Sequence, residues 1–354
     1  MNNVKLQVVC LTYNHAKFIR QALDGFVMQT TNFPFEVLIG DDASTDGTPD
    51  IIREYAEKYP DIIKPILRKK NIGAQQNSVD LLKRVNAKYL ALCEGDDYWT
   101  DPNKLQIQVD YLDSHLDCNG CWHDTEIKKE PDIKEWNSDF YFIPDKKGRQ
   151  FWPNSIAHFN KHKTQYTLSD ILDGPIATAS VVYRYPEKME YPEWFAHAIA
   201  GDRAMHAFMI KNKYFAYINK TMSVYRVSRT GAWFTKNSNT NPTNEITDWI
   251  NFIKNINKTL GTEYNLIFQE YIEAFFAEHL DKAFDRQDYD LVKYIMTVQP
   301  KLFMTRVSNY KKQKKFAHKI FKTPYLSIVS NGVNAKLYLF GIRILKLKRY
   351  RHEK

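Results

Sequence analysis

The sequence predicts an α/β protein with a doubly wound, mostly parallel sheet flanked by helices. Short apolar runs alternate with amphipathic stretches through the first 100 residues. Alternation of this kind is typical of parallel strands joined by right-handed crossover helices. Polar and acidic clusters also follow three of the apolar runs directly, which is where such sheets bind ligands.

The strand-like and helix-like segments can be placed in order along the chain. In the first part, apolar residues are contiguous in four expected strands, at 6–11, 35–39, 66–67 and 89–93. They recur at helical spacing in three expected helices, at 18–27, 48–59 and 79–85. Thr48 suits the N-cap of the second helix and Pro49 its first position.

The periodicity weakens after residue 125. Residues 125–170 are rich in Lys, Asp, Pro and Trp, and we expect long loops there. Further strands are expected at 181–183 and 214–218, with a helix at 201–211 between them. Residues 245–298 have helical periodicity, which predicts a helical C-terminal extension.

Composition excludes several classes of protein. The chain has 354 residues, of which 44% are hydrophobic and 26% charged, so it can bury a large core and is not broadly disordered. It has no run of 18 apolar residues, and its N-terminus has no secretory apolar core. Four cysteines do not make a disulfide framework in a chain of this length. We therefore expect a cytoplasmic protein.

The net charge of +9 is concentrated in the C-terminal tail. Residues 301–354 contain 15 Lys and Arg and one acid, whereas the first 300 residues contain 35 bases and 40 acids. Bases alternate with large apolar residues at 311–316 and 337–350, a pattern that favours contact with an anionic membrane surface. A solvated or partner-binding tail is the alternative. No nucleic-acid-binding motif accompanies the charge, so no nucleic acid is expected.

Three polar clusters are predicted to meet at one edge of the sheet, because each follows a parallel strand. They are residues 12–15, 40–48 and 94–99. Carboxylates gathered at one edge repel each other unless they share a cation or hydrogen-bond donors. Mg²⁺ or Mn²⁺ meets that demand, since proteins often supply one or two carboxylates and phosphates complete the coordination.

Four motifs in this order and spacing resemble a family 2 glycosyltransferase with the GT-A fold, of the bacterial surface-glycan type. They are VVCLTYN (8–14), DDASTDGT (41–48), NIG (71–73) and EGDDYW (94–99). The resemblance covers roughly residues 4–235. It implies a nucleotide-sugar donor, most often UDP-linked, a Mn²⁺ or Mg²⁺ cofactor, and inversion at the anomeric carbon.

The resemblance also implies roles for individual residues. Asp42 resembles the aspartate that accepts a hydrogen bond from the uracil base, and Tyr13 the aromatic residue that stacks near it. Asp96 would contact the ribose or a metal-bound water, and Asp97 would hold the metal against the diphosphate. The remaining residues expected to bind the donor in these motifs are Thr12, Asn14, Asn71 and Gly73.

The second half of the resemblance supplies the general base. Gly201-Asp202 precedes a predicted helix, as the family's catalytic carboxylate does, so Asp202 is the expected base; a plain N-cap aspartate is the alternative. Ser228 stands where relatives often carry a histidine. Arg226 or Arg229 is therefore expected to hold the diphosphate, because guanidinium pairs well with phosphate oxygens. A surface ion pair is the alternative for either arginine.

Other readings of these motifs stay open. Each acidic run could be an ordinary turn that caps a helix. Cys118 and Cys121, with His115 and His123 nearby, resemble half of a zinc site, but one CxxC without a second pair is a weak signal. A nucleotidyltransferase would carry a glycine-rich loop after the first strand, which is absent here. A non-catalytic adaptor with a basic tail, binding nucleotide or nucleic acid, is a third alternative.

Together these inferences predict four parts. Residues 1–125 form a nucleotide-sugar-binding half, 126–240 an acceptor-binding half with the base, 241–300 a helical extension and 301–354 a basic amphipathic tail. The expected function is transfer of a sugar to a hydroxyl of a glycan or lipid-linked oligosaccharide. The tail would place the protein on the inner face of the cell membrane.

Overall fold

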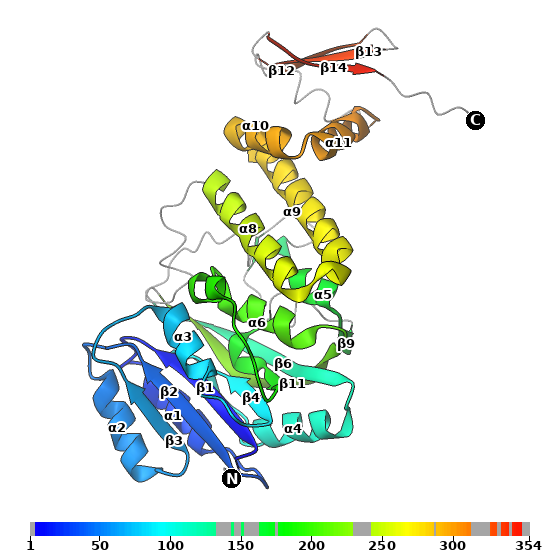
Figure 1. Ribbon diagram of the computed structural model, residues 1–354. Helices are drawn as coiled ribbons and strands as arrows, with labels where there is room; N and C mark the ends of the chain where they lie inside the picture. The colour runs from blue at the N-terminus through cyan, green and yellow to red at the C-terminus, as the bar shows by residue number, and fades with distance from the viewer. Residues whose placement is uncertain are drawn as a thin grey trace. The chain divides into compact units, whose positions relative to one another are not determined.

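The computed structural model describes most of the chain (Figure 1). The described residues are 4–131, 143–144, 150–151, 163–173, 176–228, 242–286, 288–312, 326–330, 334–339 and 342–348. The chain divides into two compact units, residues 1–271 and 272–354. The three polar clusters expected at the sheet edge all belong to the first unit.

A mixed sheet forms the centre of the first unit. Its described strands are β1 (Leu6–Thr12), β2 (Phe35–Asp41), β3 (Ile63–Leu67), β4 (Tyr89–Leu92), β5 (Tyr98–Trp99), β6 (Cys118–Lys129), β9 (Gln165–Tyr166), β10 (Val182–Arg184) and β11 (Tyr214–Val227). They lie in the order β3-β2-β1-β4-β10-β6-β11-β5, with β9 beside β11. Strands β1 to β4 are parallel, and so are β6 and β11, while β10 is antiparallel to both of its neighbours. The predicted mostly parallel α/β sheet is confirmed.

Helices cover both faces of this sheet (Figure 1). The helices of the first unit are α1 (Ile19–Val27), α2 (Thr48–Lys58), α3 (Ala74–Leu82), α4 (Lys104–Ser114), α5 (Leu168–Asp173), α6 (Gly201–Ile210) and α8 (Pro242–Leu260). Val8 and Val37 share a core with residues of α1, α2 and α4. Val9 and Leu38 alternate to the other face, and they are buried as well. Burial on both faces explains why these strands are continuous apolar runs.

The structure extends two of the expected elements. Residues 125–129, expected to be loop, continue β6, because they pair in parallel with the second half of β11. Strand β11 runs to Val227 rather than ending near 218, since register shifts between Ile218 and Ser223 let it bend and continue beside β6. Helix α2 begins at Thr48, with Gly47 at the cap, one residue earlier than expected.

The described part of the second unit consists of helices followed by a small sheet. Helix α9 (Asn265–Arg286) continues into this unit, and α10 (Tyr289–Val298) and α11 (Pro300–Lys312) follow. The described backbone of the basic tail forms an antiparallel sheet of β12 (Leu326–Ser330), β13 (Asn334–Leu339) and β14 (Ile342–Lys348). No helix in the described part of the chain is long and apolar enough to cross a membrane.

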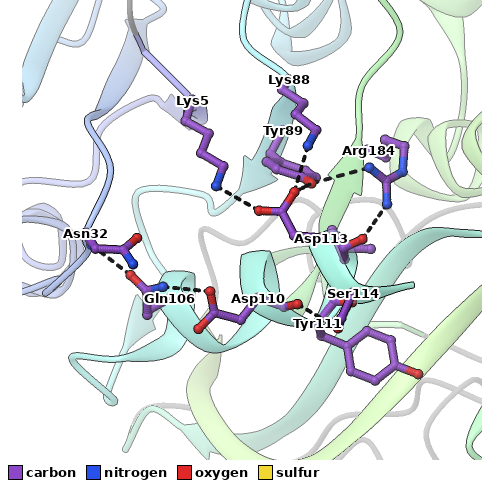
Figure 2. Close-up of polar contacts among 11 residues, drawn as sticks. Lys5, Asn32, Lys88, Tyr89, Gln106, Asp110, Tyr111, Asp113, Ser114 and Arg184 are labelled. Atoms are coloured by element: carbon purple, nitrogen blue, oxygen red, sulfur yellow. Dashed lines mark hydrogen bonds and ion pairs between the residues drawn. The ribbon is translucent and has the colours of Figure 1, made fainter. Parts of the chain in front are cut away.

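A charged cluster fixes the edge of the sheet where β1 and β4 begin. Figure 2 shows Lys5, Lys88 and Tyr89 converging on Asp113 of α4. The two lysine Nζ atoms lie 2.7 and 2.6 Å from its carboxylate oxygens, and the tyrosine hydroxyl donates to the same group. Arg184 of β10 donates to the Tyr89 hydroxyl and to backbone carbonyls at the end of α4. The cluster therefore ties α4 to three strands.

The Asp113→Asn variant is expected to unfold about 1–2 kcal/mol more easily at pH 7. Burial opposes ionisation of Asp113, but the hydrogen bonds from Lys5, Lys88 and Tyr89 outweigh it and hold its pKa well below the usual range. A lowered carboxyl pKa stabilises the fold above about pH 4, and this stabilisation is lost as the pH falls further. Urea unfolding at pH 7 and pH 3 measures it. If the difference in unfolding free energy between variant and wild type is the same at both pH values, the stabilising role given to the ionised Asp113 is contradicted.

Candidate active site

The ends of β1, β2 and β4 bring three motifs to one edge of the sheet. Thr12 and Asp41 are paired residues at the ends of β1 and β2. The backbone N–H of Gly95 donates to the Leu11 carbonyl, which extends the β1–β4 pairing past the end of β4. The acidic segment 94–97 therefore lies directly beside the end of β1.

Hydrogen bonds fasten the loop after β1 to the loop after β2. The Asn14 N–H donates to the Ser44 hydroxyl, and the Asn14 carboxamide oxygen accepts from the Thr45 N–H. Asp41, which is buried, accepts two hydrogen bonds from Ser44. Asn14 has a φ of 55°, a left-handed conformation that asparagine tolerates. Tyr13 is left with 46% of its surface exposed at this edge.

Asp42 connects the end of β2 to the segment 71–73. Its two carboxylate oxygens accept the backbone N–H groups of Ile72 and Gly73, at 2.9 and 2.8 Å. The Asn71 side-chain oxygen also accepts from the Gly73 N–H. Gly73 has a φ of 89°, which residues with a Cβ rarely adopt. Asp42 thus positions this segment, and its contact with a base stays a prediction.

Asp97 carries a buried acceptor without a partner. Its Oδ1 accepts the Arg226 backbone N–H at 2.8 Å, whereas its Oδ2 is buried and makes no hydrogen bond to any described residue. Gly95 lets this segment approach β1 closely, because a Cβ there would lie 2.8 Å from the Thr12 hydroxyl oxygen. That oxygen is also buried and has no hydrogen-bond partner in the described part of the chain. Asp96 Oδ2 lies 3.9 Å from His15 Nε2.

The carboxylates of two distant segments repel each other at this edge. Burial raises the pKa of Glu94 to about 8, and the charges of Asp96 and Asp202 contribute to the rise. Burial followed by the charges of Asp96 and Glu94 also raises the pKa of Asp97. Asp202 follows Glu94 by more than 100 residues in the sequence. The fold therefore brings Asp202 within electrostatic range of the acidic segment.

Asp202 is the second residue of α6. Its Oδ1 accepts the Arg203 backbone N–H at 2.8 Å, so the carboxylate lies at the helix N-terminus. A carboxylate at this position interacts favourably with the partial positive charge of the helix N-terminus. The capping alternative and the predicted base are therefore compatible at this position, and the role of Asp202 as base stays a prediction.

Arg226 is buried and bonded to protein groups on all sides. Its guanidinium donates to the Asp96 carbonyl and the Gln21 side chain, and it forms an ion pair with Glu130. The side chain is 3% exposed, so the surface-pair alternative does not apply. These contacts hold the acidic segment in place, and diphosphate binding by Arg226 stays a prediction. Arg229 lies outside the described residues.

The donor set suits a divalent cation that a diphosphate also binds. Among the described residues, no three His, Cys, Asp or Glu side chains form a group that could hold a metal ion unaided. Asp97 nevertheless offers a buried oxygen that is unpaired among the described residues, and burial followed by the charges of Asp96 and Glu94 raises its pKa. Hard cations such as Mg²⁺ and Mn²⁺ bind one or two carboxylates and take their other ligands from phosphate and water. The residues present therefore fit such an ion.

Two contributors at this edge were missed in the sequence. Glu94 belongs to the EGDD motif but had no assigned role, because the burial and the charges that raise its pKa depend on the fold. His15 follows the first motif and lies against Asp96. The position of both directly after a strand was a usable signal, since side chains there face the carboxyl edge of the sheet.

Comparison with known structures defines the class of fold. The crystal structure of S. aureus TarS 1–349 in complex with UDP-GlcNAc matches with a TM-score of 0.56 and 16% identity, over 95% of this chain and 97% of that one. A longer S. aureus TarS structure matches with a TM-score of 0.52 and 15% identity, over 95% of this chain and 59% of that one. The first unit has the GT-A fold.

Sequence comparison then gives the family. Residues 7–173 match the model described as Glycosyl transferase family 2. An uncharacterized protein of Mycobacterium tuberculosis is 40% identical over 228 residues, which are 64% of this chain and 60% of the relative, so the chain spans less than two thirds of that relative's length. Residues 7–173 are therefore similar to glycosyltransferase family 2, as the motifs predicted.

Proposed function

We propose that this chain is a metal-dependent, inverting glycosyltransferase. It transfers a hexose from a nucleotide sugar, UDP-linked, to a hydroxyl of a glycan or lipid-linked oligosaccharide in surface polysaccharide synthesis. One observation carries the proposal: burial and then the charges of Asp96 and Asp202 raise the pKa of Glu94, so Asp202 lies within electrostatic range of the segment 94–97. This supports a site in which the proposed base faces the proposed diphosphate-binding edge.

The donor half of the mechanism uses the edge formed by β1, β2 and β4. The exposed ring of Tyr13 stacks against the base, and Asp42 holds the segment 71–73 in position beside it. Asp96 and Asp97 would hold Mn²⁺ or Mg²⁺ against the diphosphate. When bound, the cation offsets the negative charge of the departing nucleoside diphosphate.

The acceptor half depends on Asp202. Its carboxylate takes the proton of the acceptor hydroxyl as that oxygen bonds to the anomeric carbon. The bond between the anomeric carbon and the diphosphate oxygen breaks on the opposite face, which inverts the configuration. The Arg203 backbone N–H at the start of α6 donates to this carboxylate and holds it in position.

Relatives support the donor and acceptor classes proposed. The matching TarS structure is described in complex with UDP-GlcNAc. A poly(ribitol-phosphate) beta-glucosyltransferase of Bacillus spizizenii is 32% identical over 98 residues, which are 27% of this chain and 15% of that protein. A UDP-linked hexose and a surface polymer are thus the first donor and acceptor to test.

The proposal is tested by incubating the purified chain with UDP- and GDP-linked sugars and Mn²⁺. We expect slow release of UDP from one nucleotide sugar, and loss of that release when the cation is chelated. Turnover of a GDP sugar alone would contradict the UDP assignment. A chain that neither binds nor hydrolyses any nucleotide sugar would contradict the function.

We also propose that the basic tail binds anionic lipid at the inner face of the cell membrane. Replacing Lys311, Lys312, Lys314 and Lys315 by Gln should weaken binding to anionic vesicles strongly, because each base contributes roughly 1 kcal/mol at such a surface. Co-sedimentation with phosphatidylglycerol and phosphatidylcholine vesicles measures this. If the wild type and the Gln variant bind equally well to phosphatidylglycerol and to phosphatidylcholine vesicles, lipid docking is refuted.

A further inference from the structure

The side chain of Gln75 lies against the start of the helix that carries Asp202. Gln75 is the second residue of α3, and it is partly buried. A Cβ built on Gly201 would lie 2.3 Å from Gln75 Oε1 and 3.3 Å from its Nε2. The absence of a side chain at Gly201 therefore leaves the space that the Gln75 carboxamide occupies.

This carboxamide has no hydrogen-bond partner among the described residues. The nearby Asn77 contrasts with it, because its carboxamide donates to the Gly40 carbonyl and accepts from Arg68 Nε. A carboxamide offers two N–H donors and an acceptor oxygen. Partly buried groups of this kind are satisfied by water or by a ligand.

Gln75 is placed between the two halves of the proposed site. On one side, Gly73 is two residues away and is held by Asp42 on the donor edge. On the other side, Gly201 precedes the proposed base. The base must reach the hydroxyl that attacks the anomeric carbon, so the transferred sugar must lie within a few ångströms of Asp202.

We propose that Gln75 binds a hydroxyl group of the donor sugar and thereby helps to select which hexose is transferred. The inference rests on the proposed function, because it needs a sugar beside Asp202. A carboxamide suits this task, since it donates to one hydroxyl oxygen and accepts from another hydroxyl proton. A site built to bind a hydroxyl discriminates against sugars that lack it.

The test compares Gln75→Leu with Gln76→Leu, an exposed glutamine one position along the same helix. Each protein is assayed for kcat/KM with the best nucleotide sugar and with its analogues that lack one hydroxyl. We expect the kcat/KM of the wild type to be about tenfold or more lower with one analogue than with the full donor. With the full donor, Gln75→Leu should have a kcat/KM that is lower than that of the wild type by the same factor. Its kcat/KM should then be the same for the full donor and for that analogue. UDP affinity should change less than about twofold.

A second variant keeps the inference falsifiable if Gln75→Leu folds poorly. Gln75→Asn keeps the carboxamide but shortens its reach, so it should lose the same discrimination while thermal melting stays near that of the wild type. The inference is overturned if either folded variant keeps the wild-type ratio of kcat/KM between the full donor and that analogue. It is also overturned if kcat/KM falls by the same factor with the full donor and with every analogue. If the wild type turns over a nucleotide sugar and Gln75→Leu matches Gln76→Leu, this inference alone fails. If the wild type binds no nucleotide sugar, the proposed function fails with it.

Discussion

The Asp202→Asn variant is expected to transfer sugar about 10²–10⁴-fold more slowly than the wild type, with donor affinity nearly unchanged. Asparagine has the same shape and can still accept the Arg203 N–H, so α6 should keep its start. It cannot take up the proton of the acceptor hydroxyl. Steady-state transfer assays, together with titration of the donor, separate the two effects.

A matched control for this variant is Asp50→Asn. Asp50 also lies in the first turn of a helix, α2, but it is exposed and pairs only with Arg53 among the contacts described. Its replacement should leave transfer unchanged. If Asp202→Asn transfers sugar at the wild-type rate, the general base is another residue.

The Asp97→Asn variant is expected to lose cation-dependent donor binding and at least about 10³-fold in kcat/KM. The change removes the negative charge at the buried Oδ2, which has no hydrogen-bond partner among the residues that the structure describes. The backbone N–H of Arg226 can still donate to the carboxamide oxygen that takes the place of Oδ1 in this variant. Isothermal titration with UDP and Mn²⁺, with Asp101→Asn as a control from the same segment, measures the loss.

The Asp97→Asn variant should be at least as stable to unfolding as the wild type, although it loses donor binding and activity. Burial and then the charges of Asp96 and Glu94 raise the pKa of Asp97 in the folded state, so its ionised form destabilises the ligand-free protein above about pH 4. The variant should therefore melt at the wild-type temperature or higher at pH 7. A lower melting temperature combined with lost activity would point to misfolding instead of a lost ligand.

Much of the fold could be predicted because local periodicity and burial agree in the first 100 residues. Val8, Val9, Val37 and Leu38 are buried on one face or the other, as their continuous apolar runs indicated. The antiparallel insertion of β10 between β4 and β6 was not predicted, because pairing across such distances leaves no local pattern. The length of β11 was missed for the same reason, since β6 supports its second half.

The candidate site was predicted unevenly. Residues directly after strands, such as Asp97 and Asp42, could be located because the carboxyl edge of a parallel sheet gathers them. Arg226 was expected to face a phosphate, yet its partners Gln21 and Glu130 lie far away in the sequence. Gln75 gave no sequence signal, since its position depends on the meeting of two helix starts.

The crowded carboxylates at the sheet edge link the stability of this protein to the binding of a cation. Glu94, with its pKa raised to about 8, holds a proton that the unfolded chain would release at neutral pH. The ligand-free chain therefore becomes easier to unfold as the pH rises from about 4 towards 8. Any bound ligand that supplies positive charge at this edge relieves the repulsion and protects the native state by mass action. A divalent cation bound at this edge should therefore slow digestion of the protein by a protease.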